Sequence, residues 1–182
     1  MKAGVYVHVP FCMRKCGYCD FYSLPGRGEA DFDAYTEALI REIRAEERGV
    51  EADTVYFGGG TPSLLGAARL TRVLDALRES FRLAEDAEIT LEANPLDLSG
   101  AEELRRAGFD RLSLGVQSAH DAELRLLGRR HTFAQAVETV RAARAAGFEN
   151  LSLDLMYGLP GQTMEAWVES IRALTALAPE HI

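Results

Sequence analysis

The sequence has no apolar run long enough for a membrane-spanning helix, which needs about 18–20 consecutive apolar residues. The apolar stretch at residues 4–12 is interrupted by His8 and Pro10 and has no small-residue cleavage site, so it predicts no signal peptide. Low-complexity tracts, internal repeats and linkers are also missing. With 47% hydrophobic and 26% charged residues, the composition excludes disordered and fibrous classes and indicates one globular domain over residues 1–182.

Basic residues are also in short supply. The 20 Lys and Arg residues face 28 Asp and Glu residues, which gives a formal net charge of -8. This balance argues against nucleic acid or an anionic membrane as a general partner. The exception is residues 1–28, where Lys2, Arg14, Lys15 and Arg27 are opposed only by Asp20. This basic patch coincides with the cysteines.

Only three cysteines are present, and all lie within eight residues: Cys12, Cys16 and Cys19. An odd, clustered set does not predict a disulfide framework, and the missing targeting signal leads us to expect a reducing, cytoplasmic location. Zinc in structural sites takes four ligands, of which the loop supplies three, with His8 as a conceivable fourth. Iron–sulfur clusters also take thiolates, and three thiolates on a four-iron cluster leave one iron open. Three free thiols are the remaining alternative.

Short β-rich segments alternate with amphipathic helical patterns along the chain. The strand-like segments are residues 4–9, 54–57, 88–91, 111–116 and 151–156. The helical patterns span residues 32–43, 70–81, 101–107, 133–140 and 164–174, and Gly108 and Gly147 are expected to end two of them. Strict alternation predicts an α/β fold of parallel strands with helical crossovers. Residues 179–182 indicate the entry to a sixth strand, so we expect a truncated barrel or a sheet edge covered by a partner.

Polar segments follow the predicted strands. They are the cysteine loop, Gly58-Gly59-Gly60-Thr61-Pro62, Glu92-Ala93-Asn94-Pro95, Gln117-Ser118 and Tyr157-Gly158-Leu159-Pro160, the last after a strand that carries Asp154. Functional groups gather at the carboxyl ends of parallel strands in such folds. We therefore expect these five segments to meet at one mouth.

The motif Tyr6-x-His8-x-Pro10-Phe11-Cys12-x3-Cys16-x-Tyr18-Cys19 resembles the radical S-adenosylmethionine (SAM) superfamily. Five further motifs resemble, within it, the branch that contains oxygen-independent coproporphyrinogen III oxidase and the HemW-type haem chaperones. They are Gly58-Gly59-Gly60-Thr61-Pro62-Ser63, Leu91-Glu92-Ala93-Asn94-Pro95, Ser113-x-Gly115-Val116-Gln117-Ser118, Leu127-Gly128-Arg129-x-His131 and Asp154-Leu155-Met156-Tyr157-Gly158-Leu159-Pro160.

The resemblance implies a partial (β/α)6-type radical SAM barrel that lacks the C-terminal region of its relatives. It also implies that Cys12, Cys16 and Cys19 hold a 4Fe-4S cluster whose open iron binds the amino and carboxylate groups of SAM. In that family an electron from the reduced cluster cleaves the C5′–S bond of SAM and gives a 5′-deoxyadenosyl radical. A flavodoxin or ferredoxin is the implied electron donor.

The resemblance also assigns residues to SAM. Those matching positions around the first SAM are Tyr6, Tyr18, Gly59, Gly60, Thr61 and Glu92, and those matching contacts to a second SAM in the oxidase relatives are Gln117, Arg129 and Asp154. Without the resemblance the signals are weak, because a glycine run is often a plain turn and an arginine is often a surface cation. Glycines do allow the backbone to approach a ligand closely.

One position separates two functions within the branch. The oxidases carry a fourth cysteine two residues beyond the third, whereas this sequence has Phe21 there, as in the HemW-type pattern. The resemblance therefore favours a chaperone that binds haem or a porphyrin and delivers haem to acceptor proteins, and it names no certain catalytic residue. The alternatives are SAM-dependent decarboxylation of coproporphyrinogen III to protoporphyrinogen IX, and an unrelated radical SAM reaction such as one on tRNA, which the acidic composition disfavours.

Overall fold

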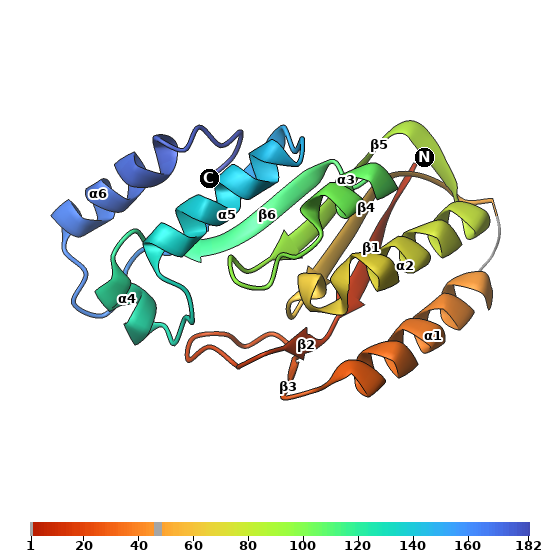
Figure 1. Cartoon of the computed structure of the whole chain (residues 1–182), viewed down its shortest axis with the longest axis horizontal. Helices are drawn as coiled ribbons and strands as arrows, with labels where there is room; N and C mark the ends of the chain where they lie inside the picture. Colours follow the sequence, from red (N-terminus) through yellow and green to blue (C-terminus); the bar gives the residue numbers. More distant parts are fainter. Residues whose placement is uncertain (1, 46–48) are drawn as a thin grey trace.

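The central sheet of the computed structural model, which describes residues 2–45 and 49–182, has five parallel strands (Figure 1). They are β1 (Ala3–Val9), β4 (Glu51–Gly59), β5 (Arg82–Ala93), β6 (Arg111–Gln117) and β7 (Asn150–Leu155), in the order β1-β4-β5-β6-β7. Each strand pairs in parallel with the next strand of this list. The prediction of an α/β fold with parallel strands is confirmed.

The helices lie on one side of this sheet. They are α1 (Glu29–Ala45), α2 (Gly66–Ser80), α3 (Ala101–Ala107), α4 (Asp121–Leu126), α5 (Phe133–Ala145) and α6 (Met164–Thr175), with a 3-10 turn, η1, at Pro62–Leu65. Because the strands follow one another in chain order and parallel crossovers share one hand, the helices between them stack on the same face. Figure 1 shows α2, α3 and α5 in front of the strands and α1 beside α2.

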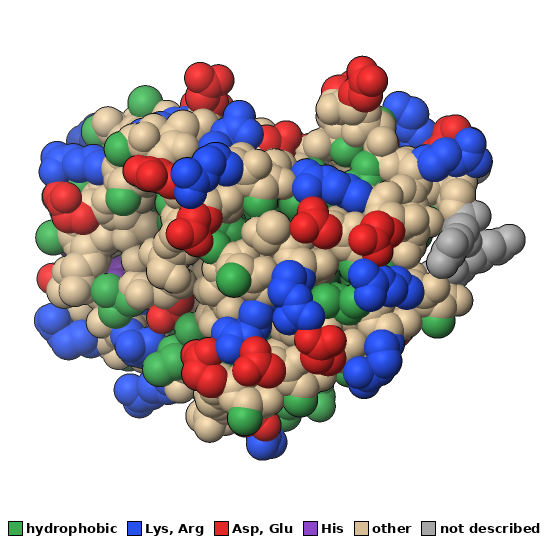
Figure 2. Space-filling view, turned by 45° about the vertical axis from the view of Figure 1, so that its right-hand side comes forward, with side chains coloured by type: hydrophobic (Ala, Val, Ile, Leu, Met, Phe, Trp, Pro, Cys, Tyr) green, Lys and Arg blue, Asp and Glu red, His purple; other side chains and the backbone are tan. Residues whose placement is uncertain are grey.

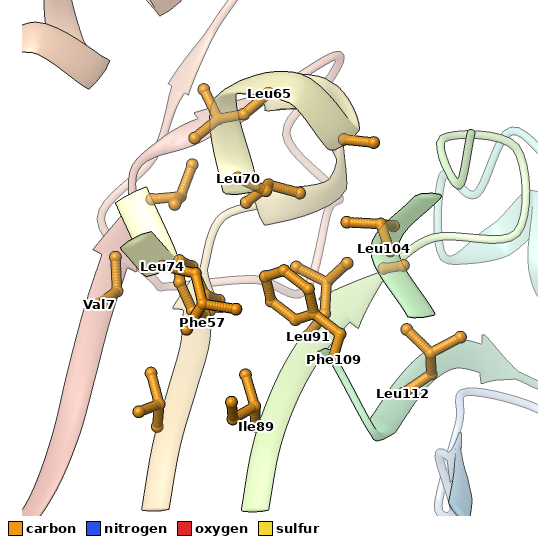
Figure 3. Packing of buried hydrophobic residues seen from close by; sticks show 14 of the residues in the cluster. Val7, Phe57, Leu65, Leu70, Leu74, Ile89, Leu91, Leu104, Phe109 and Leu112 are labelled. Atoms are coloured by element: carbon orange, nitrogen blue, oxygen red, sulfur yellow. The ribbon is translucent and has the colours of Figure 1, made fainter. Parts of the chain in front are cut away.

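The core lies between the sheet and these helices (Figure 3). Phe57 on β4 and Phe109, which follows α3, are fully buried with ring centroids 5.1 Å apart. Leu70 and Leu74 of α2 pack into the same cluster. Full burial of such a side chain stabilises the fold by roughly 1.5–3 kcal/mol relative to leaving it exposed. The apolar periodicity of the sequence therefore identified the core face.

Two predicted helix ends are also confirmed. Gly108 and Gly147 have φ angles of 106° and 91°, a conformation that glycine adopts without a Cβ penalty. At the other end of α5, Thr132 and Gln135 form a capping box. Beyond α6, the backbone of Leu153 donates to the carbonyl of His181 at 3.0 Å, and Ser152 and His181 form an isolated parallel bridge beside β7, where the entry to a sixth strand was expected.

The strands β4 and β5 begin earlier than the apolar pattern predicts. Glu51 and Ala52 pair with Arg82 and Leu83, although hydrophobic alternation was recognised only from residues 54 and 88. Backbone pairing continues here where side chains such as Glu51 are exposed, so the side-chain pattern does not report it. A second, two-stranded parallel sheet was also not predicted. It pairs β2 (Phe11–Cys12) with β3 (Leu24–Pro25).

The outer surface carries intermixed charges (Figure 2). Arg69 of α2 lies 2.6 Å from Glu29 and 2.6 Å from Asp33 of α1, and Arg44 lies 2.9 Å from Glu79. Exposed pairs of this kind contribute about 0–1 kcal/mol each. No helix within residues 2–45 and 49–182 has the length and apolar character needed to cross a membrane.

Candidate functional site

The cysteine loop is closed at its base and fastened to the rest of the molecule. Phe11 pairs with Leu24 across the β2–β3 sheet, and the Leu24 N–H donates to the Pro10 carbonyl at 2.6 Å. Gly17 N–H donates to the Leu127 carbonyl at 3.3 Å, just beyond α4. The three cysteines within this loop are free of disulfides and partly buried. The loop therefore presents three thiols from one anchored segment.

Every predicted site residue except Tyr6 lines one cavity of about 180 Å³ at the carboxyl ends of the strands. These residues are Cys12, Cys16, Cys19, Tyr18, Gly59, Gly60, Thr61, Glu92, Gln117, Arg129 and Asp154. Arg14, Lys15 and Phe21 of the cysteine loop line the same cavity. The topology thus brings together segments that are more than 100 residues apart in the chain.

Tyr6 lies outside this group. Its side chain is 58% exposed, its hydroxyl is 3.4 Å from Nδ1 of His8, and its ring stacks on Tyr56 with centroids 6.1 Å apart. It sits on β1 three residues before the strand ends, which places it beside the cavity wall rather than in the lining.

The glycines at the end of β4 are required by the protein itself. A Cβ on Gly60 would lie 2.5 Å from the carbonyl oxygen of Phe11, and one on Gly59, where φ is 110°, would lie 2.7 Å from the His8 ring. The Gly60 N–H donates to the Val9 carbonyl at 2.7 Å. The chain therefore passes flush against β1 and β2 here, which aligns Thr61 with the cysteine loop. From the sequence, these glycines were interpreted either as a plain turn or as a segment that passes close to a bound ligand, and this packing against β1 and β2 was not predicted.

Glu92 is held by two donors at the end of β5. Its Oε1 accepts from the hydroxyl of Tyr56 at 2.7 Å, and its Oε2 accepts from the Gly59 N–H at 3.2 Å. Burial raises the pKa of Glu92, and the two hydrogen bonds partly oppose that shift. A partly buried carboxylate is stabilised by a nearby positive charge, so this position favours a ligand that brings one. Tyr56 was not recognised from the sequence.

Asp154 has a similar environment on β7. Burial raises the pKa of Asp154, while the hydroxyl of Ser113, which donates to it at 3.1 Å, acts in the opposite direction. Nearby, Gln117 has a φ of 74°, which is unusual for a residue other than glycine and costs about 1–3 kcal/mol. Ser113 was quoted in a motif but not predicted as a site residue, and only the structure shows that it faces Asp154.

Arg129 and Asn94 form a hydrogen-bond network that reaches two of the cysteines. Nη2 of Arg129 donates to Oδ1 of Asn94 and to the Gly115 carbonyl, while Nη1 lies 3.7 Å from Sγ of Cys16. Nδ2 of Asn94 donates to Oγ1 of Thr61 at 2.9 Å, and that oxygen lies 3.6 Å from Sγ of Cys12. The sulfurs of Cys12 and Cys16 therefore each lie within reach of a polar side chain.

The donor set fits an iron–sulfur cluster better than a single ion. Within residues 2–45 and 49–182, no three His, Cys, Asp or Glu side chains converge on a point that could hold one metal ion. A cluster instead takes each thiolate on a different iron. Burial raises the pKa of Cys12, with the Thr61 hydrogen bond opposing it, and metal coordination would deprotonate the thiol outright.

Residues 6–174 match the radical SAM superfamily, and the chain belongs to it. Membership in this superfamily implies a 4Fe-4S cluster and SAM. Within the superfamily, the chain is 39% identical to "Heme chaperone HemW" of Escherichia coli (strain K12) over 98% of its own length and 49% of that protein. It is 42% identical to "Heme chaperone HemW" of Lactococcus lactis over 98% of its own length and 47% of that protein.

A solved structure supports the same placement. "Coproporphyrinogen III oxidase (HemN) from Escherichia coli" superimposes with a TM-score of 0.89 and 34% identity, covering 97% of this chain and 42% of that one. The relatives also include "Radical S-adenosyl methionine domain-containing protein 1, mitochondrial" of Mus musculus, at 39% identity over 100% of this chain and 42% of that protein. The chain thus spans about half the length of the curated relatives it matches.

Proposed function

We propose that this chain is the radical SAM core domain of a haem chaperone, which binds haem and passes it to acceptor proteins. The observation that carries the proposal is the identity of about 40% to haem chaperones over nearly the whole chain. The free thiols suit a reducing compartment, and we assign the protein to the cytoplasm.

Phe21 supports the chaperone over the oxidase. It is 66% exposed and lines the cavity beside the cysteines. An aromatic ring can pack against the flat face of a porphyrin, but it can neither ligate a metal nor transfer a proton. Phe21 thus places an apolar ring at the position where the oxidases carry a fourth thiol, which could ligate a metal or transfer a proton.

The residues around the cavity have distinct tasks in this proposal. Cys12, Cys16 and Cys19 hold the cluster, which when reduced supplies the electron that cleaves SAM in this superfamily. Glu92 binds the cationic amino group of SAM, and Tyr56 and the Gly59 N–H keep its carboxylate in place. Arg14 and Lys15 give the loop a positive face, which suits an acidic electron donor such as a flavodoxin or ferredoxin.

A second function, SAM-dependent coproporphyrinogen III decarboxylation, is favoured by one observation. Gln117, Arg129 and Asp154, which match the second SAM contacts of the oxidases, all line the cavity. The close superposition on the oxidase fold is compatible with either function, because fold alone does not decide activity.

Anaerobic reconstitution with iron and sulfide, followed by separate haem-binding and decarboxylation assays, tests the proposal. We expect stoichiometric haem binding, no protoporphyrinogen with reductant and excess SAM, and weaker haem binding in Phe21→Ala. Tyr22→Ala is the matched control, because Tyr22 is equally exposed, at 69%, yet does not line the cavity. Catalytic turnover to protoporphyrinogen would overturn the chaperone proposal and establish the oxidase.

A further inference from the structure

Asn94 uses both ends of its side-chain amide. It lies at the end of β5, in a turn closed by the Asp97 N–H, which donates to the Asn94 carbonyl at 2.9 Å. Nδ2 donates to Oγ1 of Thr61 at 2.9 Å and to Oδ2 of Asp97 at 3.4 Å, while Oδ1 accepts from Nη2 of Arg129.

The chemistry of its neighbours determines the direction of each hydrogen bond. Arginine can only donate and an ionised carboxylate can only accept, so the amide oxygen of Asn94 must face Arg129 and its nitrogen must face Asp97. The hydroxyl oxygen of Thr61 then accepts from Asn94, which leaves its single hydrogen for Sγ of Cys12, 3.6 Å away. A metal-bound thiolate has no hydrogen to donate, so the same direction holds in the cluster-bound protein.

We infer that Asn94 is a positioning residue that aims one donor at each of two cluster ligands and thereby raises the reduction potential of the cluster. The two donors are the Thr61 hydroxyl toward Cys12 and the Arg129 guanidinium toward Cys16, 3.7 Å from its sulfur. The inference rests on the proposed function only in requiring that the cysteines hold a cluster.

The sign of the effect follows from charge. Reduction adds negative charge to the cluster and its thiolate sulfurs, and hydrogen bonds to these sulfurs stabilise the more negative state. Thr61 is only 3% exposed, so its hydrogen bond acts where water screens little. Asp97 is itself held 3.3 Å from Arg130 and fixes the amide from the far side. A fixed amide keeps both donors directed at sulfur rather than at solvent.

The first experiment compares Asn94→Leu with the parent after anaerobic reconstitution. We expect equal iron and sulfide content but a lower midpoint potential in a redox titration without SAM. Asn150→Leu is the matched control, because the amide of Asn150 lies 3.4 Å from Glu88 at the other end of the sheet. Its potential should equal that of the parent. An iron-loaded Asn94→Leu with the parent potential would overturn this inference alone, whereas a parent that binds no iron would overturn the cluster assignment and the inference together.

A second experiment asks whether Asn94 acts through Thr61. Thr61→Val should also lower the potential, and Thr61→Ser, which keeps the hydroxyl, should restore most of it. The double variant Thr61→Val/Asn94→Leu should shift the potential by less than the two single shifts combined, because Asn94→Leu has already released the hydroxyl. Fully additive shifts would mean that the residues act independently and would overturn the inference, even if Asn94→Leu alone behaved as expected.

Discussion

The two ends of the parallel sheet use their polar groups in opposite ways. At the amino ends, arginine side chains donate to backbone carbonyls where helices end: Arg78 to Ala107 at 2.8 Å and Arg105 to Gly147 at 3.0 Å. At the carboxyl ends, thiols and the carboxyl groups of Glu92 and Asp154 face a cavity. These two arginines are thus partnered within the protein, whereas Glu92 and Asp154, although each accepts hydrogen bonds from the protein, also line a cavity where a ligand can reach them.

The largest effect is expected from Cys16→Ala at the carboxyl end. Removing one of the three thiolates leaves too few ligands for the cluster. The anaerobically reconstituted variant should therefore lack iron and the broad absorption at about 400 nm that thiolate–iron charge transfer produces. Iron analysis alongside the spectrum checks this. Stoichiometric zinc in the parent, with no iron after reconstitution, would contradict the assignment.

The next largest effect is expected from Glu92→Ala, which is compared with a second glutamate on the same strand, β5, farther from its carboxyl end. Losing a charged hydrogen-bonding partner should weaken SAM binding by about 1.5–3 kcal/mol, or roughly 10- to 100-fold, with cluster content unchanged. Calorimetry on the reconstituted protein measures it. Glu88→Ala is the matched control, because Glu88 lies on β5 as well but near Arg111, outside the cavity lining. Equal affinities in both variants would remove Glu92 from the SAM site.

Tyr56→Phe should have a smaller effect that depends on pH. Burial raises the pKa of Glu92 and the Tyr56 hydroxyl lowers it, so removing the hydroxyl should raise that pKa further. SAM affinity, which needs the ionised carboxylate, should then begin to fall at a higher pH as the solution is acidified. Dissociation constants measured from about pH 8 to about pH 5 in both proteins check this. Asp154 titrates in both, so the difference between the two curves reports on Glu92, and superimposable curves would contradict the role of Tyr56.

The smallest effect is expected at the amino end. Arg105→Ala removes one exposed hydrogen bond to the Gly147 carbonyl and should lower the free energy of unfolding by about 0.5–1 kcal/mol. Urea denaturation measures this, and SAM affinity should stay at the parent value. A large loss of SAM affinity would show that the two ends are coupled and that the contrast between them is wrong.

The sequence was sufficient for the features that repeat along the chain. Parallel strands, core-facing helix stripes and the glycine ends of α3 and α5 follow from local periodicity and backbone sterics, and the structure confirms them. The short β2–β3 pairing was missed because two residues carry no periodicity. The first residues of β4 and β5 were missed because their side chains do not continue the apolar alternation.

The candidate site was predictable only in part. Motifs at the strand ends located the residues that share the cavity, but Tyr6 lies beside it because its position on β1 is set by the strand register. The hydrogen bonds of Asn94, Tyr56 and Ser113 depend on side-chain orientation across strands, which no local pattern encodes. An Asn-Pro pair directly after a buried strand was the available sign that Asn94 occupies a shaped turn.

The closed base of the cysteine loop has a consequence for how cofactor loading proceeds. Because Phe11 and Leu24 are already paired, the conformational entropy of bringing the ends of this loop together is lost when the chain folds and not when iron arrives. Once one thiolate is attached, the others compete for the growing cluster as intramolecular ligands at a high effective concentration. Weakening the β2–β3 pair should therefore slow cluster assembly far more than it weakens the fold.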